Sequence, residues 1–420
     1  MSAPEDQPLR PGPSPVPLAT RILAWWGRRG SGALRWAAVL MALAAVVWLS
    51  YETWRLLWQG PPLGAIDLQQ RYTETRALFA GRAVYRLFAA ASYPPASMTM
   101  LWPIVGWPSF AAARCLWALL TIVALVCTAR MVVRDSGATT RAERRLAMLL
   151  PFAMYATGAA TGNGQLTVLV VACLIASLPI LLRADRAMPL ALAVLGFVGA
   201  LVKPSLAAPF FWMVLFRPKK PFPTIAIVAI YLGLTVIAGL AQPMSSVQLC
   251  HEFLLRTDDL STAGAANYGH ANLHSCLGAV GQPDWNAPVS LVLLGLLAVW
   301  TWRHRRADPW LLMSAAAFAA RFWTYHGWYD DLLLLIPMIT LFRVAKQGTT
   351  DGQKVWAGSL LAAMVCSTLA PGGLYLLPSP WNKIYVVGQT VVWLAACAFL
   401  LRATKPPVAI GQLSAAPAPQ

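Results

Sequence analysis

Residues 109–133 read SFAAARCLWALLTIVALVCTARMVV, a run in which Arg114 and Arg130, near its two ends, are the only charged residues. An α-helix needs about 20 apolar residues to cross the hydrocarbon core of a bilayer, so this stretch predicts a transmembrane helix. Similar runs recur along nearly the whole chain. With 109–133 they predict twelve helices, at 36–57, 109–133, 146–161, 165–182, 187–202, 205–216, 222–241, 287–302, 309–322, 329–342, 355–376 and 384–401. The segment 187–216 could be two short helices or one helix broken at Lys203-Pro204.

The composition agrees with this pattern. Hydrophobic residues make up 58% of the 420 residues and charged residues only 12%. A soluble globule of this composition would expose a large apolar surface. We therefore expect an all-α polytopic membrane protein with about 12 transmembrane helices.

The net charge of +17 would suggest a nucleic-acid partner in a soluble protein, so the positions of the charges matter. Of the 33 Lys and Arg residues, 23 lie in the N-terminal arm and in connections on one side of the predicted helices, and ten lie on the other side. The positive-inside rule makes the basic side cytoplasmic. We expect membrane lipids rather than nucleic acid around the protein, both termini in the cytoplasm, and a bacterial cytoplasmic membrane as its location.

The domain organisation follows from the helices. Residues 1–35 are predicted to be a disordered cytoplasmic arm, 36–402 the transmembrane domain, and 403–420 a disordered cytoplasmic tail. The N-terminal apolar run is too long for a signal peptide and lacks a small-residue cleavage site. Function should lie in the outer stretches 58–95 and 242–286 and in the helix ends beside them.

The first outer stretch contains Asp67, its first carboxylate, followed by Tyr93-Pro94-Pro95. Partial burial at the membrane surface would raise the pKa of Asp67 and make it a usable general base. The simpler interpretation is a solvated loop carboxylate.

The sequence Thr161-Gly162-Asn163-Gly164-Gln165 separates two apolar runs on the same outer side. It could be only a tight turn. The amides of Asn163 and Gln165 could also bind a polar ligand at a helix end.

Three further outer positions carry charge or amide groups beside apolar helices. Lys203 interrupts apolar sequence, where a charge is costly unless it is paired or hydrated; it could neutralise a phosphate or snorkel to the interface. Arg321, His326, Tyr329 and Asp330 lie in a segment whose aromatics could be ordinary interfacial residues or a stacking surface for sugars. The loop residues Asn267 and Asn272 add amide groups.

Five of the seven cysteines fall in predicted helices as small apolar residues. Cys250 and Cys276 lie in the long outer loop, where an oxidising compartment would permit a disulfide between them. No cysteine or histidine spacing resembles a metal site, so no metal and no cofactor is expected.

In combination and order, these motifs resemble glycosyltransferase family 87. They are the Asp in the first outer loop, the Tyr-Pro-Pro run, Gly-Asn-Gly-Gln at a helix start, Lys-Pro before another helix, an Asn-rich outer loop and a late aromatic-His segment. The resemblance covers about residues 36–400. The members concerned are GT-C mannosyltransferases that use polyprenyl-phosphate mannose.

The resemblance implies a GT-C-like bundle with a catalytic first outer loop. It implies an inverting transfer of a sugar, with mannose expected, from a polyprenyl-phosphate donor to a lipid or glycan acceptor on the outer face. Asp67 would be the catalytic base. Lys203, His326 and Arg321 would bind the donor phosphate, and Tyr93, Asn163, Gln165, Asn267, Asn272, Tyr329 and Asp330 would contact substrate.

Two other classes of function stay open from the residues alone. A secondary transporter would carry ionisable residues at mid-membrane and often internal repeats, whereas these charges collect at one face and no repeat is evident. A noncatalytic protein of envelope assembly is the second alternative, because membrane topology by itself does not fix function.

Overall fold

The computed structural model describes residues 17–183, 186–217, 221–264 and 271–402. Over these residues the secondary structure is helical and contains no strand; the one β-type feature there is an isolated antiparallel bridge between Met154 and Leu369. The predicted all-α class is confirmed.

The chain order of the elements begins with one long helix and a group of short ones before the main bundle. The first elements are α1 (Leu18–Trp58), α2 (Ile66–Phe79), α3 (Val84–Leu87), α4 (Pro95–Val105), α5 (Phe110–Asp135), α6 (Arg141–Ala153), α7 (Tyr155–Asn163), α8 (Thr167–Arg183), α9 (Ala187–Ala200), α10 (Pro204–Leu215) and α11 (Phe222–Leu240). The remaining elements are α12 (Ser246–Gly264), α13 (Leu273–Ala279), the 3₁₀ helix η1 (Pro283–Trp285), α14 (Asn286–Arg303), α15 (Pro309–Phe322), η2 (Trp328–Leu334), α16 (Leu335–Gln347), α17 (Asp351–Thr368), η3 (Leu374–Leu376) and α18 (Trp381–Arg402).

Within the described residues, five segments are long and apolar enough to cross a bilayer: α1, α5, α11, Pro283–Arg303 and α18. A sixth arises if α7 and α8, which meet at a bend of 120°, count as one broken span. The protein is therefore an all-α membrane protein. The prediction of twelve spans is not confirmed, because several apolar helices, including α9 and α10, are shorter than 18 residues.

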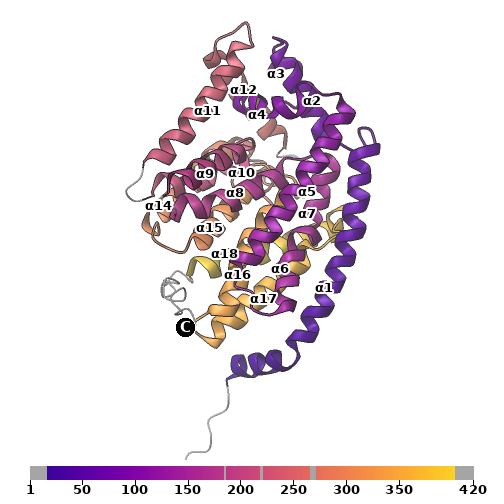
Figure 1. Ribbon diagram of the computed structural model, residues 1–420, viewed down its shortest axis with the longest axis vertical. Helices are drawn as coiled ribbons and strands as arrows, with labels where there is room; N and C mark the ends of the chain where they lie inside the picture. The colour runs from indigo at the N-terminus through magenta and orange to yellow at the C-terminus, as the bar shows by residue number, and fades with distance from the viewer. Residues whose placement is uncertain (1–16, 184–185, 218–220, 265–270, 403–420) are drawn as a thin grey trace, which may run out of the picture.

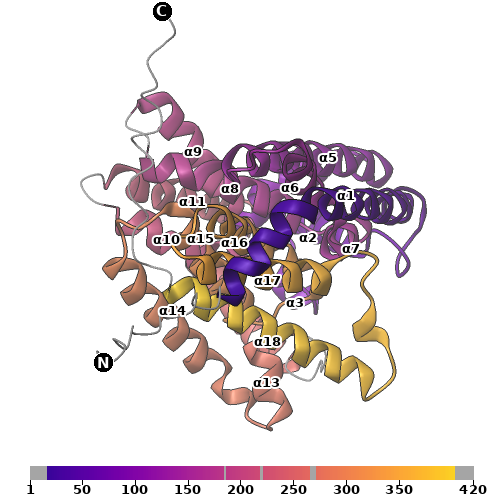
Figure 2. The same ribbon diagram turned by 90° about the horizontal axis from the view of Figure 1, so that it is seen from below.

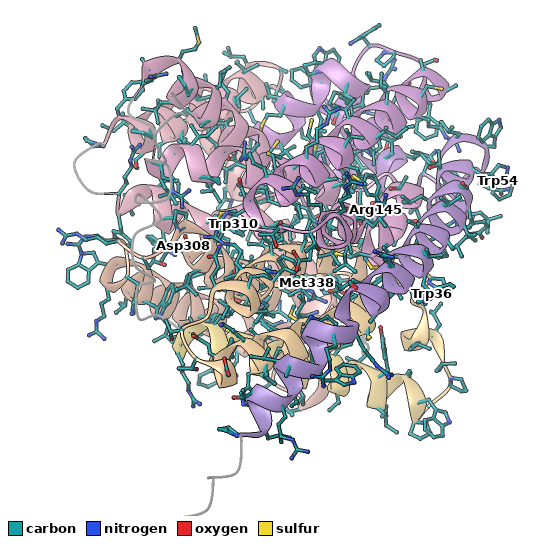
Figure 3. The ribbon with its side chains drawn as sticks, turned by 60° about the horizontal axis from the view of Figure 1, so that its bottom comes forward. Trp36, Trp54, Arg145, Asp308, Trp310 and Met338 are labelled. Carbon is teal, nitrogen blue, oxygen red and sulfur yellow. The ribbon has the colours of Figure 1, made fainter. Side chains whose placement is uncertain are left out.

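The apolar surface of the bundle faces outward, as expected where lipid is the solvent. Only 17% of the 18-residue apolar segment with which α1 could span the membrane is buried inside the protein. Figure 3 shows Trp36 and Trp54 projecting from the outer side of α1, and both side chains are exposed. Trp310 of α15 and Met338 of α16 are instead buried in the interior.

The helices are arranged around α15 and α16, which contact each other and are flanked by α8, α10, α17 and α18 (Figure 2). Helix α1 runs along one side of the bundle, and α2, α3, α4 and α12 gather at one end, the top of Figure 1. The opposite end carries α6, α17 and the beginning of α1. The polar outer stretches therefore form a cap of helices over one end of the bundle.

The N-terminal boundary of the first helix was predicted wrongly. Helix α1 begins at Leu18 rather than near 36, so residues 18–35, predicted as part of the disordered arm, are helical. The arm contains no proline after Pro17, and its Leu, Ala and Arg residues favour helix, which allows the apolar span to extend into it. Residues 1–16 and the predicted tail 403–420 lie outside the described residues.

Two predicted spans are interrupted. The span 146–161 breaks at Met154, whose backbone is extended, and the amide of Ala370 donates to the carbonyl oxygen of Ala153 at 2.7 Å. Backbone after α17 therefore inserts at this break. The span 329–342 begins as the 3₁₀ helix η2 and becomes α-helical only at Leu335.

The outer stretches predicted as loops contain helices, notably α2 and α3 in 58–95 and α12 in 242–286. These helices were not predicted because the stretches are polar. The apolar periodicity that marks a helix is weak when both faces of the helix meet protein or water. The open question about 187–216 resolves into two short helices, α9 and α10, with Lys203 as the N-terminal cap residue of α10.

Candidate active site

Asp67 lies in the first turn of α2, and the start of this helix is fixed on the turn between α7 and α8. The amide of Ala65 donates to the carbonyl oxygen of Gly162 at 2.8 Å. Gly164 adopts the left-handed region at φ +70°, and a Cβ there would meet the Cβ of Leu68 at 2.5 Å. Glycine is therefore required where the turn packs against α2, and this contact sets the position of Asp67.

The Asp67 carboxyl is surrounded by groups of both signs. Burial, the largest effect, raises its pKa, and the negative charge of Asp330 raises it further. The charges of Arg71 and Lys203 and a hydrogen bond from Gln165 act in the opposite direction without cancelling the rise. Gln165 is buried, whereas Asp67 keeps partial exposure. A carboxyl that is desolvated but still accessible suits a general base.

Arg71 lies one helical turn after Asp67 and connects it to a second carboxylate and an aromatic ring. Its Nη1 is 2.8 Å from Oε2 of Glu74, and its guanidinium lies 4.2 Å from the centroid of the Tyr93 ring. Burial raises the pKa of Glu74 to about 7, with Arg71 lowering it and Asp67 raising it. The Tyr93 side chain is buried against this guanidinium, and its ring forms a wall of the site.

Lys203 and Asp330 form a buried ion pair across from Asp67. The Lys203 Nζ is 2.6 Å from Oδ1 of Asp330, and the same oxygen accepts a hydrogen bond from the Thr167 hydroxyl at 2.6 Å. The ammonium also lies 4.9 Å from the centroid of the Tyr329 ring. The lysine is thus paired inside the protein and does not snorkel away from it. This pair joins α10 to η2, and Thr167 adds the start of α8.

His326 contacts the other oxygen of Asp330. Its Nδ1 is 3.0 Å from Oδ2 of Asp330, while its buried Nε2 has no hydrogen-bond partner in the described part of the chain. Because a carboxylate only accepts, Nδ1 carries the proton and donates it to Asp330. Burial lowers the pKa of His326 below its usual value despite the opposite effect of Asp330, which favours the neutral ring with a lone pair on Nε2. Asn272 fixes the segment by donating from Nδ2 to the His326 carbonyl oxygen at 3.3 Å.

Arg321 belongs to a separate buried cluster behind this site. Its Nε is 2.5 Å from Oδ1 of Asp331, and its Nη1 donates to the Ala271 carbonyl oxygen at 3.0 Å. The Tyr155 hydroxyl donates to the other oxygen of Asp331. The guanidinium is 1% exposed and occupied by these contacts, so a role for Arg321 in holding the bundle is the simpler interpretation.

The structure brings together most of the residues predicted from the sequence. Asp67, Tyr93, Gln165, Lys203, His326, Tyr329 and Asp330 converge, with Asn272 bracing the histidine segment. Asn163 is the last residue of α7 and is partly exposed. Asn267 lies outside the described residues. Cys250 and Cys276, both described, are free thiols, so the disulfide considered for them is not formed.

Several residues of the site were not predicted. They are Arg71, Glu74 and Thr167. Arg71 follows Asp67 by four positions, the spacing that places two side chains on one face of a helix, so a helix prediction for 66–79 would have found it. Thr167 could not be singled out from the sequence, because a hydroxyl side chain in an apolar helix is common. Among the described residues no group of three or more His, Cys, Asp or Glu side chains is placed to hold a metal ion.

Comparison with models of known protein families gives a match. Residues 91–325 match the family model of glycosyltransferase family 87, which is more than half of the chain. No curated protein and no solved structure matches. The matched segment includes Tyr93, Gln165 and Lys203 but begins after Asp67 and ends just before His326.

Proposed function

Because the chain belongs to glycosyltransferase family 87, we propose that it transfers a sugar from a polyprenyl-phosphate donor to a lipid or glycan acceptor, with Asp67 as general base. The observation that carries this proposal is the Asp67 carboxyl itself. It is desolvated, has a raised pKa and stands close to the Lys203–Asp330 pair, so that a proton acceptor and a cation occupy one site.

The proposed reaction is a single displacement. Asp67 takes the proton of an acceptor hydroxyl while the oxygen of that hydroxyl forms a bond to the anomeric carbon. The bond between that carbon and the phosphate oxygen breaks, and its electron pair leaves with polyprenyl phosphate. Attack opposite to the leaving group inverts the anomeric centre. Mannose is the sugar we expect.

Lys203 and His326 would stabilise the leaving phosphate. Electrostatic groups held in place before the reaction are often the largest contribution to catalysis. The Lys203 ammonium donates to Asp330 at 2.6 Å and to the Thr167 hydroxyl at 3.5 Å. A phosphate arriving beside the neutral His326 would raise the pKa of the imidazole, so that Nε2 becomes a hydrogen-bond donor to the phosphate while Nδ1 stays on Asp330.

We further propose that the site faces the outer side of a bacterial cytoplasmic membrane, with both termini inside. The support is that segments expected to be cytoplasmic contact one another. Lys346 pairs with Glu143 at 2.7 Å, and Asp308 lies 3.1 Å from Arg343. The two stretches expected to be outer loops meet at the other end, where Arg86 of α3 pairs with Glu252 of α12.

The test of the proposed base is the Asp67→Asn substitution. General base catalysis contributes about 10²- to 10⁴-fold, so we expect a loss of transfer of that size. The measurement is transfer of radiolabelled mannose from polyprenyl phosphate to endogenous acceptors in membranes containing the full-length protein.

The control is Asp284→Asn, which removes the same charge from an exposed outer position. It should leave transfer within about twofold of wild type, because exposed charges away from the site interact weakly. Wild-type transfer by Asp67→Asn would rule out the base role. Absence of transfer by the wild-type protein would contradict the proposed donor.

A further inference from the structure

A buried carboxylate of α1 contacts the turn that positions Asp67. Glu52 is the only acidic residue of α1 and is 1% exposed. A Cβ added to Gly162 would collide with Oε2 of Glu52, so the glycine allows α7 to approach this carboxylate closely. An ionisable side chain in an apolar helix is costly, which makes its contacts candidates for a function.

This contact belongs to a regular interface between α1 and α7. Trp48 precedes Glu52 by four residues, and its Nε1 donates to the Tyr155 carbonyl oxygen at 3.1 Å. Gly158 precedes Gly162 by the same spacing, and a Cβ at Gly158 would collide with the Trp48 indole. Residues four apart share one helix face, and small residues at this spacing let two helices approach closely. The interface therefore fixes which part of α7 faces Glu52.

Arg55 extends the contact to the chain between α1 and α2. Its Nη1 lies 2.7 Å from Oε2 of Glu52, and its Nε donates to the Leu63 carbonyl oxygen at 2.7 Å. A Cβ at Gly64 would collide with the Arg55 carbonyl oxygen, so this chain turns back closely on the end of α1. Arg55 therefore holds the loop two residues before Ala65.

The Glu52–Arg55 pair thus reaches both sides of the hydrogen bond at the start of α2. In that bond the amide of Ala65 donates to the Gly162 carbonyl oxygen at 2.8 Å. Glu52 lies against the acceptor residue, and Arg55 holds the loop that leads to the donor residue. Asp67 follows two residues after Ala65, so a shift of either side would move its carboxyl.

Packing alone does not account for this ion pair. Replacing a buried ion pair by apolar residues of similar volume is often neutral or stabilising. Oε1 of Glu52 is buried and has no hydrogen-bond partner among the described residues, which adds to the cost of burying the carboxylate. The position of the turn, rather than stability, is therefore the better reason for a carboxylate at this place.

We propose that Glu52 is a positioning residue, which sets the place of Asp67 in the candidate active site through Gly162 and Arg55. This inference rests on the proposed function for its catalytic consequence. Glu52 itself touches neither the donor nor the acceptor. Its loss should therefore lower the rate of the chemical step while leaving the binding of the donor nearly unchanged.

The first experiment separates turnover from donor binding. Full-length protein in nanodiscs is assayed for transfer from polyprenyl-phosphate mannose to lipids extracted from the native membranes. Misplacing a catalytic group by about 1 Å can cost 10²-fold in rate, so we expect Glu52→Ala to lower kcat about 10²-fold. The KM for the donor should stay within about twofold. Glu52→Gln should lower kcat only about threefold, because its amide oxygen still accepts from Arg55.

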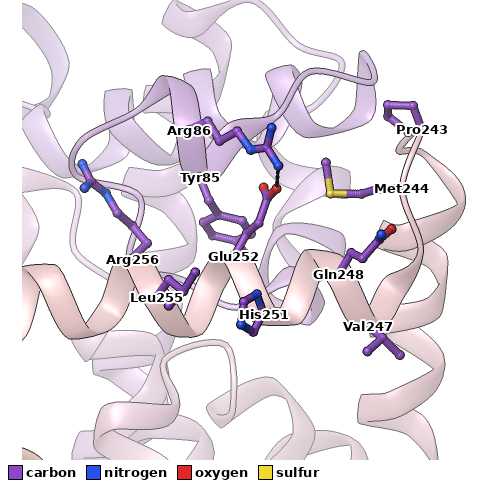
Figure 4. Close-up of a pocket in the computed structure, with 10 residues that line it drawn as sticks. All are labelled: Tyr85, Arg86, Pro243, Met244, Val247, Gln248, His251, Glu252, Leu255 and Arg256. Carbon is purple, nitrogen blue, oxygen red and sulfur yellow. Dashed lines mark hydrogen bonds and ion pairs between the residues drawn. The ribbon is translucent and has the colours of Figure 1, made fainter.

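Two variants control for general effects of substitution. Glu252→Gln removes the charge from another Glu–Arg ion pair at the end of the bundle that carries α2; Figure 4 shows this pair, between Glu252 of α12 and Arg86 of α3. Met41→Ala truncates another buried side chain of α1, about three helical turns before Glu52. Both should keep kcat within about twofold of wild type, because neither contacts the turn. A loss by Met41→Ala equal to that by Glu52→Ala would overturn the proposal.

Gly162→Ala tests the contact from the α7 side and decides the question if thermal unfolding shows that Glu52→Ala does not fold. The added methyl should press on the Glu52 carboxylate and lower kcat about tenfold. The double variant Glu52→Ala/Gly162→Ala should lose no more than Glu52→Ala alone, because the methyl fits where the carboxylate was. Wild-type kcat for either folded single variant, or additive losses in the double variant, would overturn the proposal.

Hydrogen exchange separates this proposal from the proposed function, because it needs no substrate. Glu52→Ala should speed amide exchange in residues 60–70 at least about tenfold, whereas Met41→Ala should leave it unchanged. If exchange changes in this way but the wild type transfers no sugar, the positioning by Glu52 stands and the proposed function fails. If the wild type transfers sugar and Glu52→Ala exchanges as wild type does, the positioning role alone fails.

Discussion

Asp330 is saturated by its neighbours in this structure. One carboxylate oxygen accepts from Lys203 and Thr167, and the other contacts Nδ1 of His326. The Asp330 carboxylate therefore has little capacity left to accept hydrogen bonds from a substrate. We therefore interpret Asp330 as the residue that positions Lys203 and His326, rather than as the direct substrate contact expected from the sequence.

The charges around Asp67 predict opposite pH shifts for two substitutions. Lys203 lowers the pKa of Asp67 and Asp330 raises it. The base must be deprotonated, so activity falls as the pH drops through its pKa. Lys203→Gln should move this acid limb to higher pH by about one unit, and Asp330→Asn should move it to lower pH. The measurement is the pH profile of kcat/KM for each variant, with Asp284→Asn as the unshifted control. Shifts of the same sign would contradict this electrostatic account.

The site was predictable where residue type and position were unusual together. Lys203 next to a proline in apolar sequence and His326 among aromatics and carboxylates both stood out, and the structure brings them to Asp330. Arg321 was equally unusual in sequence, yet its guanidinium is committed to Asp331. Sequence position cannot separate a charge that is paired for packing from one that serves a ligand, because both need a buried partner.

At the scale of elements, η2 is held between two ion pairs that face different neighbours. Asp330 pairs with Lys203 of α10, and Asp331 pairs with Arg321 of α15 and accepts from Tyr155 of α7. Three helices are thereby attached to one short 3₁₀ helix. The positions of the proposed catalytic groups Lys203 and His326 depend on this attachment.

Asp331→Asn should therefore destabilise the protein. Removing one partner of a buried ion pair leaves an uncompensated charge and costs on the order of 3 kcal/mol. The measurement is the thermal unfolding midpoint of purified protein, which should fall clearly below that of wild type. Asp284→Asn should unfold as wild type does. An unchanged midpoint for Asp331→Asn would show that Arg321 is satisfied without it.

The sequence predicted the presence of helices better than the residues at which they begin, end or break. Apolar runs located α5, α8, α11, α14 and α18 to within a few residues. The interruption at Met154 was not predictable, because it depends on backbone from residues 369–370, far away in sequence. Tertiary contacts of this kind leave no local pattern.

At the scale of the whole molecule, ion pairs outside the candidate site and the cluster behind it include two groups at opposite ends. One group joins the basic segments, through Glu143, Asp308 and their partners, and the other joins α3 to α12. This division agrees with the charge asymmetry along the chain. It supports a single orientation in the membrane.

Reporter fusions test that orientation. A reporter fused after Thr140 should give a cytoplasmic signal and one after Asp284 an outer signal, because the two positions lie on opposite sides of the predicted spans. A fusion after Asp351 should match that after Thr140, since Thr20 donates to Asp351 from the same end of the molecule. Identical signals at Thr140 and Asp284 would contradict the topology.

The length of α1 has one more consequence. At 41 residues it extends roughly 60 Å, about twice the thickness of the hydrocarbon core, and Figure 1 shows its first part turned across the rest. The Gly30-Ser31-Gly32 triplet is where such a bend costs least. This first part of α1 would lie on the lipid head groups beside the bundle. Its side chains exposed for such contact include Trp25, Trp26, Arg28 and Arg29. It would set the depth at which the bundle sits in the membrane, and hence the height of Asp67 above the bilayer relative to the proposed lipid-linked donor.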